Sequence, residues 1–207
     1  HSVSDMEVIR EKLKIDRWYV FGGSYGTTLA LVYAIAHPKR VRHLILRGIF
    51  LGRQEDMDWL YLNGPKNFYP KEYQKFIEWI DEEDRGDLIK AYYYKMTTGD
   101  EQTRKLTMKK WADWERGLDN IFPKFNQNPE IKESDLSIGL LEAYYFANHM
   151  FWPEENYILN HVDKIQSIPT DIVHGRYDVN CRVRGAYELK KALPQANLHI
   201  IEAGAHS

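Results

Sequence analysis

The stretch that decides the fold is WYVFGGSYGTTLALVYAIAH, residues 18–37. It opens with a continuous run of strand formers, which is typical of a strand buried on both faces. Residues 22–26 form a glycine-rich turn, and residues 27–37 are apolar almost all round, which predicts a buried helix that Pro38 ends. A second buried strand is predicted at 43–48. A strand, a helix and a strand within about 30 residues form a βαβ unit, so this region predicts a parallel sheet.

The α/β pattern returns near the C-terminus, where 170–175 and 198–202 are predicted strands and 185–193 is a predicted helix. Between the two α/β regions, helical patterns dominate and no convincing buried strand is present. We therefore expect an α/β core interrupted by an inserted all-helical cap. The predicted segments are residues 1–51 for the first part of the core, 52–160 for the cap and 161–207 for the second part of the core.

The composition excludes several classes of protein. With 207 residues, 43% of them hydrophobic, and a formal net charge of −2, the chain is neither disordered nor a dedicated binder of nucleic acid or anionic membranes. No run of about 18 apolar residues could span a bilayer. Cys181 is the single cysteine and has no partner for an internal disulfide, which favours a reducing compartment, so we expect a cytoplasmic protein. No metal-ligand spacing is present, and we expect neither a metal nor a cofactor.

Gly22, Ser24 and Gly26 match the G-x-S-x-G pattern of a nucleophile elbow. In such an elbow the serine hydroxyl projects above the sheet, at the positive end of the following helix. We expect both glycines to be required because side chains would collide in so tight a turn. Alone, the pattern is weak, since chance produces it about once in fifteen chains of this length. The preceding strand and following helix favour the elbow over an ordinary βα turn of small residues.

A nucleophilic serine needs a base, and the base needs an orienting acid. Asp178 and His206 each come just after one of the two C-terminal predicted strands. The carboxyl ends of parallel strands meet at one sheet edge, where ligands bind. The order Ser24, Asp178, His206 is that of the α/β-hydrolase triad. Taken alone, Asp178 would be interpreted as a solvated turn residue and His206 as an exposed surface residue. Their order and their positions after strands, taken together, predict a catalytic triad. His174, inside a strand, is interpreted as a hydrogen-bonded packing residue.

Four segments carry a wider resemblance. They are GGSYGTTLAL at 22–31 with His37-Pro38 after it, LRGIF at 46–50, HGRYD at 174–178 and GAHS at 204–207. Together they resemble the proline iminopeptidases (prolyl aminopeptidases), which are α/β-hydrolases with a helical cap, and the similarity runs along essentially the whole chain. The resemblance implies metal-free release of N-terminal proline from peptides, and it implies the same triad.

The resemblance also implies substrate contacts outside the triad. Glu115 and Glu142 would hold the charged secondary ammonium of an N-terminal proline through charge-assisted hydrogen bonds. From the sequence alone, each would be a solvated helix residue. The implied pocket for the proline ring consists of Phe50 and Cys181, with Arg47 nearby and Tyr61 as an aromatic wall. From the residues alone, Phe50 fits core packing equally well, and Cys181 fits burial as a small hydrophobe.

One family segment has no counterpart in this sequence. The family carries H-G-G-P-G upstream of the elbow, so we expect this chain to be a fragment that lacks N-terminal strands and that loop. The backbone N–H of Tyr25 would supply one oxyanion donor, and the absent loop would supply the second. The expected partners are peptides with N-terminal proline, not nucleic acid or membranes, and the oligomeric state is left open. The alternatives are another α/β-hydrolase (an esterase or a broader aminopeptidase) and a non-catalytic truncated module.

Overall fold

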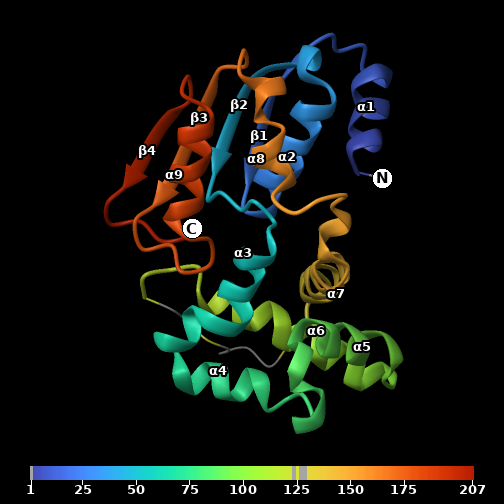
Figure 1. Cartoon of the computed structure of the whole chain (residues 1–207). Helices are drawn as coiled ribbons and strands as arrows, with labels where there is room; N and C mark the ends of the chain where they lie inside the picture. The colour runs from blue at the N-terminus through green and yellow to red at the C-terminus, as the bar shows by residue number, and fades with distance from the viewer. Residues whose placement is uncertain (1, 123–124, 126–129) are drawn as a thin grey trace. The chain divides into compact units, whose positions relative to one another are not determined.

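The computed structural model describes residues 2–122, 125 and 130–207 (Figure 1). The chain divides into two compact units. The first, which we call the α/β unit, consists of His1–Arg53 with Glu154–Ser207, and the second, the helical unit, is Gln54–Pro153.

The α/β unit is built on one parallel four-stranded sheet, as the sequence predicts. Its strands follow each other in the order β1-β2-β3-β4. Their bounds are Trp18–Gly23 for β1, Val41–Arg47 for β2, Thr170–Gly175 for β3 and Asn197–Ile201 for β4. Leu44 of β2 lies opposite Val20 on one side and Thr170 on the other. The parallel register brings the carboxyl ends of β1, β2 and β3 together, and this edge carries the residues discussed below.

The core of the α/β unit lies between the sheet and its helices. Leu44, Leu46 and Ile172 of the strands are completely buried, as are Leu31 and Tyr33 of the helix that follows β1. Figure 1 shows α9 running along β3 and β4, and the two pairs are in contact. The helices of this unit are Ser2–Lys12 (α1), Tyr25–Ala36 (α2), Tyr157–Asn160 (α8) and Val183–Ala192 (α9).

Strand β1 differs from its prediction. Tyr19 and Phe21 share one face of the strand and are 68% and 71% exposed, whereas Val20 on the other face is 7% exposed. The expectation of burial on both faces is therefore wrong for this strand within the described residues. Helix α2 packs against β1, whereas the face that carries Tyr19 and Phe21 is left exposed by the described residues. A continuous apolar run does not reveal whether both faces of a strand are covered.

The helical unit consists of helices and turns throughout its described part. Its helices are Gln54–Asp58 (α3), Pro70–Ile77 (α4), Leu88–Thr98 (α5), Glu101–Gly117 (α6) and Glu133–Ala147 (α7). A π-helical turn, Trp59–Asn63, follows α3. Aromatic rings fill its core: Phe76 stacks on Tyr92 with ring centres 4.4 Å apart, and Tyr61 packs on Trp111 at 4.3 Å. Such ring pairs contribute stabilisation in addition to that from the burial of their apolar area.

The C-terminal boundary of the helical unit lies at 153/154 rather than at the predicted 160/161. The difference is due to α8, which is in contact with α2 of the α/β unit. Ile158 of α8 is 1% exposed, so this short helix is part of that core. A four-residue helix carries too little periodicity to be assigned to either unit from sequence.

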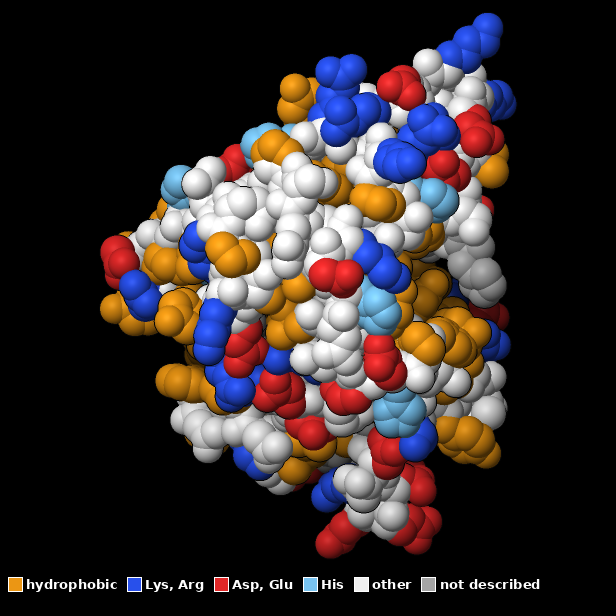
Figure 2. Space-filling model, turned by 45° about the horizontal axis from the view of Figure 1, so that its top comes forward, with side chains coloured by type: hydrophobic (Ala, Val, Ile, Leu, Met, Phe, Trp, Pro, Cys, Tyr) orange, Lys and Arg blue, Asp and Glu red, His pale blue; other side chains and the backbone are white. Residues whose placement is uncertain are grey.

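Charges of both signs are interspersed with apolar side chains over the face shown in Figure 2, in keeping with the net charge of −2. Across the described residues, each helix is too short or too polar to cross a membrane.

Candidate active site

Ser24 occupies the sharp turn between β1 and α2. Its backbone has φ 55° and ψ −128°, a conformation that L-residues rarely adopt. Its N–H donates to the Arg47 carbonyl at 2.9 Å, and its own carbonyl accepts from the Thr27 N–H at 2.8 Å. Because the Ser24 side chain makes no cap hydrogen bond to α2, its hydroxyl is available to another partner. Tyr25, the first residue of α2, places its N–H at the positive end of that helix.

The two flanking glycines of the elbow are not equivalent. A Cβ on Gly22 would lie 2.3 Å from the Gly26 carbonyl oxygen, so no side chain fits there. A Cβ on Gly26 would meet nothing within 4 Å, and the expectation of a steric need for Gly26 is wrong. At Gly23 a Cβ would lie 2.8 Å from a guanidinium nitrogen of Arg47, so a side chain there would require the end of the Arg47 side chain to shift.

The hydroxyl of Ser24 meets the imidazole of His206. The distance from Ser24 Oγ to His206 Nε2 is 2.9 Å, and His206 Nδ1 lies 2.8 Å from Asp178 Oδ2. Because an ionised carboxylate only accepts, Nδ1 carries the proton and Nε2 is left to accept from the hydroxyl. His206 and Asp178 are 5% and 6% exposed. The structure thus brings together the three residues that chain order nominated.

Asp178 is a buried carboxylate surrounded by donors. Burial alone would raise its pKa, but hydrogen bonds from His174 and His206 outweigh burial and hold the pKa below its usual range. Its second oxygen, Oδ1, accepts from the Cys181 N–H at 2.8 Å. The group is therefore ionised at neutral pH and can stabilise a positive charge on His206.

The last residue of β2 and the segment that follows it contact these residues. The Arg47 guanidinium donates to the His206 carbonyl. Gly48 has φ 64°, and a Cβ there would lie 3.1 Å from His206 Cε1. The Phe50 N–H donates to Thr27 Oγ1 at 3.0 Å, and its carbonyl accepts from Thr28 Oγ1 at 2.6 Å. Phe50 is 5% exposed. The backbone after β2 is thus joined to the elbow helix and to the residue before the C-terminus.

Cys181, the second residue of the implied ring pocket, is 7% exposed. Its N–H donates to Asp178, and its carbonyl lies 2.8 Å from His174 Nε2. Both backbone contacts hold the loop of the acid, so Cys181 lies beside the Ser24–His206–Asp178 cluster through its main chain.

In the helical unit, the two glutamates implied by the resemblance lie side by side on α6 and α7. Their carboxyl groups share a hydrogen bond. Tyr61 donates its hydroxyl to Glu115, and Trp111 donates its indole N–H to Glu142 Oε2 at 3.2 Å. Tyr61 is completely buried, so its ring belongs to the aromatic core while its hydroxyl reaches the pair.

The environment of this pair raises both of its pKa values. Burial is the largest cause for each carboxyl, and the pKa of Glu115 is raised further by the charge of Glu142. Two carboxyl groups that share a hydrogen bond hold one proton between them. This environment disfavours negative charge on the two carboxyl groups, and a cationic amine placed beside them would offset that cost.

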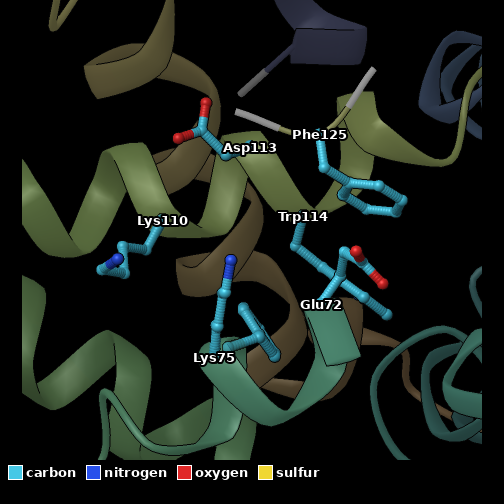
Figure 3. Close-up of a pocket in the computed structure, with 7 residues that line it drawn as sticks. Glu72, Lys75, Lys110, Asp113, Trp114 and Phe125 are labelled. Atoms are coloured by element: carbon cyan, nitrogen blue, oxygen red, sulfur yellow. The ribbon is translucent and has the colours of Figure 1, made fainter. Parts of the chain in front are cut away.

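A separate hollow of about 200 Å³ lies between α4 and α6 of the helical unit (Figure 3). It is lined by Glu72, Lys75, Phe76, Lys110, Asp113, Trp114 and Phe125. In Figure 3, Lys75 and Lys110 rise from different helices, and Asp113 is paired with Lys109 at 2.6 Å and Arg116 at 3.2 Å. The sequence-predicted site residues are not part of this lining. Over the described residues, no group of three or more acidic, histidine or cysteine side chains is arranged to hold a metal ion.

Sequence reasoning missed the support around Asp178. His174 was interpreted as a hydrogen-bonded packing residue, and it is buried with both ring nitrogens engaged. Its proximity to the acid, with Nε2 3.3 Å from Asp178 Oδ2, was not predicted. Gly48 and Thr28 were not singled out at all. The available signal was the spacing of His174 and Asp178 in HGRYD and of Arg47 and Gly48 in LRGIF, but nothing in one sequence assigns contacts to those residues.

Comparisons with known proteins identify the family of this chain. The family model for the alpha/beta hydrolase fold matches residues 2–207. The chain belongs to the α/β-hydrolase family. A proline iminopeptidase of Arabidopsis thaliana is 40% identical over 99% of this chain, and one of Neisseria meningitidis serogroup A is 43% identical over 98%. The resemblance found in the sequence is thereby confirmed. The chain spans 55% and 65%, respectively, of the length of these two relatives.

Solved structures support the same fold for this chain. An esterase from Exiguobacterium antarcticum superposes with a TM-score of 0.58 at 17% identity, covering 99% of this chain and 65% of the esterase. An alpha/beta fold family hydrolase from Bacillus anthracis superposes with a TM-score of 0.56 at 21% identity, covering 99% and 66%. At such identities the likeness concerns the fold.

Proposed function

We propose that this chain carries the reactive centre of a serine-type exopeptidase that releases N-terminal proline from peptides. The observation that carries the proposal is the continuous hydrogen-bonded series Ser24–His206–Asp178, at 2.9 and 2.8 Å. Similarity to proline iminopeptidases over 98% to 99% of the chain supports the substrate class. The half-buried carboxyl pair of the helical unit supports recognition of a cationic amine.

Acylation begins when Ser24 Oγ attacks the carbonyl carbon of the N-terminal proline. His206 Nε2 takes the hydroxyl proton as the Oγ–C bond forms, and Asp178 stabilises the resulting imidazolium. The negative charge moves to the substrate oxygen, where the N–H of Tyr25 is a donor. His206 then gives its proton to the nitrogen of the second residue, and the C–N bond breaks.

Deacylation repeats these steps with water as the nucleophile. His206 removes a proton from the water as its oxygen bonds to the acyl carbon, then returns the proton to Ser24 Oγ as the ester bond breaks. Proline leaves, and the serine is restored.

The glutamate pair gives the reaction its exopeptidase character. Glu115 and Glu142 hold the secondary ammonium, a charge that only an N-terminal proline carries. An internal proline has an uncharged tertiary amide nitrogen and would leave the carboxylates unpaired. The pair therefore selects the chain end by electrostatics rather than by shape alone.

The nucleophile assignment is tested by Ser24→Ala. Because no other group takes the place of Oγ, we expect hydrolysis of proline p-nitroanilide to fall by at least about 10⁴-fold. Stoichiometric labelling by a fluorophosphonate should also be lost. Retention of either activity by the variant would refute Ser24 as the nucleophile. Absence of labelling in the unaltered protein would favour a non-catalytic module.

The substrate class is tested by Glu115→Gln and Glu142→Gln, with Glu133→Gln, an exposed residue on α7, as the matched control. A lost charge-assisted hydrogen bond of about 1.5–3 kcal/mol predicts an increase of about 10- to 100-fold in the KM for proline p-nitroanilide. Hydrolysis of p-nitrophenyl acetate, which has no amine, should change little. Equal losses on both substrates would instead indicate an esterase or a hydrolase of broader specificity.

A further inference from the structure

His174 is a buried imidazole whose two ring nitrogens are both engaged. It lies in β3 and is 1% exposed. The backbone N–H of Ile49 points at Nδ1 at 3.0 Å. An N–H can only donate, so Nδ1 carries no proton, and the neutral ring must carry its proton on Nε2. The tautomer of His174 is therefore fixed by a main-chain contact from the segment after β2.

The proton on Nε2 is directed at the loop of Asp178. Nε2 lies 2.8 Å from the Cys181 carbonyl oxygen and 3.3 Å from Asp178 Oδ2. Such a shared, three-centre arrangement is common where one N–H faces two acceptors. Oδ2 is also the oxygen that receives His206 Nδ1. Two histidines thus converge on one carboxylate oxygen, and only one of them reaches the serine.

The last residue of β2 and the segment that follows it contact both His174 and His206. Ile49 fixes the tautomer of His174, while its neighbour Gly48 lies against the edge of the His206 ring. Arg47 donates to the main chain of His206. Consecutive residues of one backbone segment therefore set the position of both imidazoles that meet at Asp178.

We propose that His174 is a positioning residue, which donates from Nε2 to Asp178 and to the Cys181 carbonyl and so orients the carboxylate toward His206. This role rests on the proposed function, because the carboxylate matters to catalysis only if His206 is the base. His174 does not touch the substrate. It acts by limiting the rotation of a side chain that must accept from His206 in one direction.

Two variants with amide side chains distinguish the roles of the two ring nitrogens of His174. In His174→Gln the amide nitrogen reaches the position of Nε2 and keeps the donor, whereas in His174→Asn the amide oxygen replaces Nδ1 and no donor reaches Asp178. We expect His174→Gln to keep kcat within a few-fold of the unaltered enzyme. We expect His174→Asn to lose about 10- to 100-fold in kcat with little change in KM.

The split between kcat and KM distinguishes positioning from general damage, because a loosened fold would also disturb substrate binding. Greater activity in the Asn variant than in the Gln variant would overturn the proposal. Equal losses in the two, or unchanged kcat in both, would overturn it as well.

A measurement on the unaltered protein covers the case in which the variants do not fold. Nitrogen NMR of histidine-labelled protein should show His174 with Nε2 protonated and Nδ1 unprotonated, and the opposite tautomer would contradict the proposal. The rate of fluorophosphonate labelling separates this test from the proposed function. If the unaltered protein does not react, the function fails, whereas a reactive protein with the wrong His174 tautomer contradicts only the positioning role.

Discussion

At Ser24 the backbone adopts a costly conformation, at φ 55° and ψ −128°. Such conformations cost about 1–3 kcal/mol and persist only where surrounding contacts enforce them. Here the contacts are main-chain hydrogen bonds, one to the Arg47 carbonyl and one from the Thr27 N–H. The strain places the hydroxyl 2.9 Å from His206, which an ordinary helix N-cap serine would not achieve while bonded to its own helix.

Gly48 is the residue whose missing side chain leaves space for the His206 ring. In Gly48→Ala, a Cβ at positive φ costs about 1–2 kcal/mol, and it would lie 3.1 Å from His206 Cε1. We expect lower stability and a reduced kcat, as the ring shifts away from Ser24.

Gly52→Ala is the matched control, because Gly52 has a similar φ of 68°. Thermal unfolding should show comparable losses of stability in the two variants, while kcat should fall mainly in Gly48→Ala. Equal activities at equal stability would show that the ring does not depend on Gly48.

At the scale of elements, α1 is fixed to α2 by a cluster around Glu7. Arg10 donates to both oxygens of Glu7 at 2.8 and 2.9 Å, and the Tyr33 hydroxyl of α2 donates at 2.6 Å. The hydrogen bond from Arg10 is the main cause that lowers the pKa of Glu7 to about 2. Burial is the main cause that raises the pKa of Tyr33 to about 12.

This cluster predicts how stability depends on pH. The pKa of Glu7 is lower in the folded chain than the unfolded value of about 4.3, so its contribution is complete above that value and is lost as the pH falls toward 2. Glu7→Gln should therefore destabilise the protein at pH 7, by about 1 kcal/mol. The difference from the unaltered protein should shrink between pH 4 and pH 2.

Urea unfolding at several pH values measures this difference. Glu11→Gln is the control, because the Glu11 side chain is 70% exposed and lies 3.5 Å from Arg10. A loss in Glu7→Gln that stayed constant down to pH 2 would mean that the ionised carboxylate does not hold α1 in place.

At the scale of the whole molecule, the sequence predicted the elements that have a strong local pattern. The apolar helix after Ser24 and the strands β2, β3 and β4 were all identified to within a few residues. The prediction erred where the outcome depends on distant parts of the chain. The exposure of Tyr19 and Phe21 depends on which elements cover that face of β1, and the assignment of α8 depends on its contact with α2.

The candidate site, too, could be predicted only in part from the sequence. Ser24, Asp178 and His206 could be nominated because each follows a strand, and parallel strands bring their carboxyl ends to one edge. The contact between Ile49 and His174 joins residues 125 positions apart and depends on which ring nitrogen faces a backbone N–H. Side-chain orientation of that kind is set by packing, which no local pattern encodes.

The helical unit is inserted between β2 and β3. A change in the length of this insert therefore differs in its consequences from a change that affects the contact between Ser24 and His206. Leu44 of β2 is paired directly with Thr170 of β3, so the strands that flank Gln54–Pro153 in the sequence are neighbours in the sheet. The free energy of closing such a loop grows only with the logarithm of its length, by about 0.6 kcal/mol per doubling. The length of the insert can therefore change at a small cost in the free energy of folding. The contact of His206 with Ser24, 182 positions apart, instead joins the two segments of the α/β unit that flank the insert, so any change that separates these segments removes the contact.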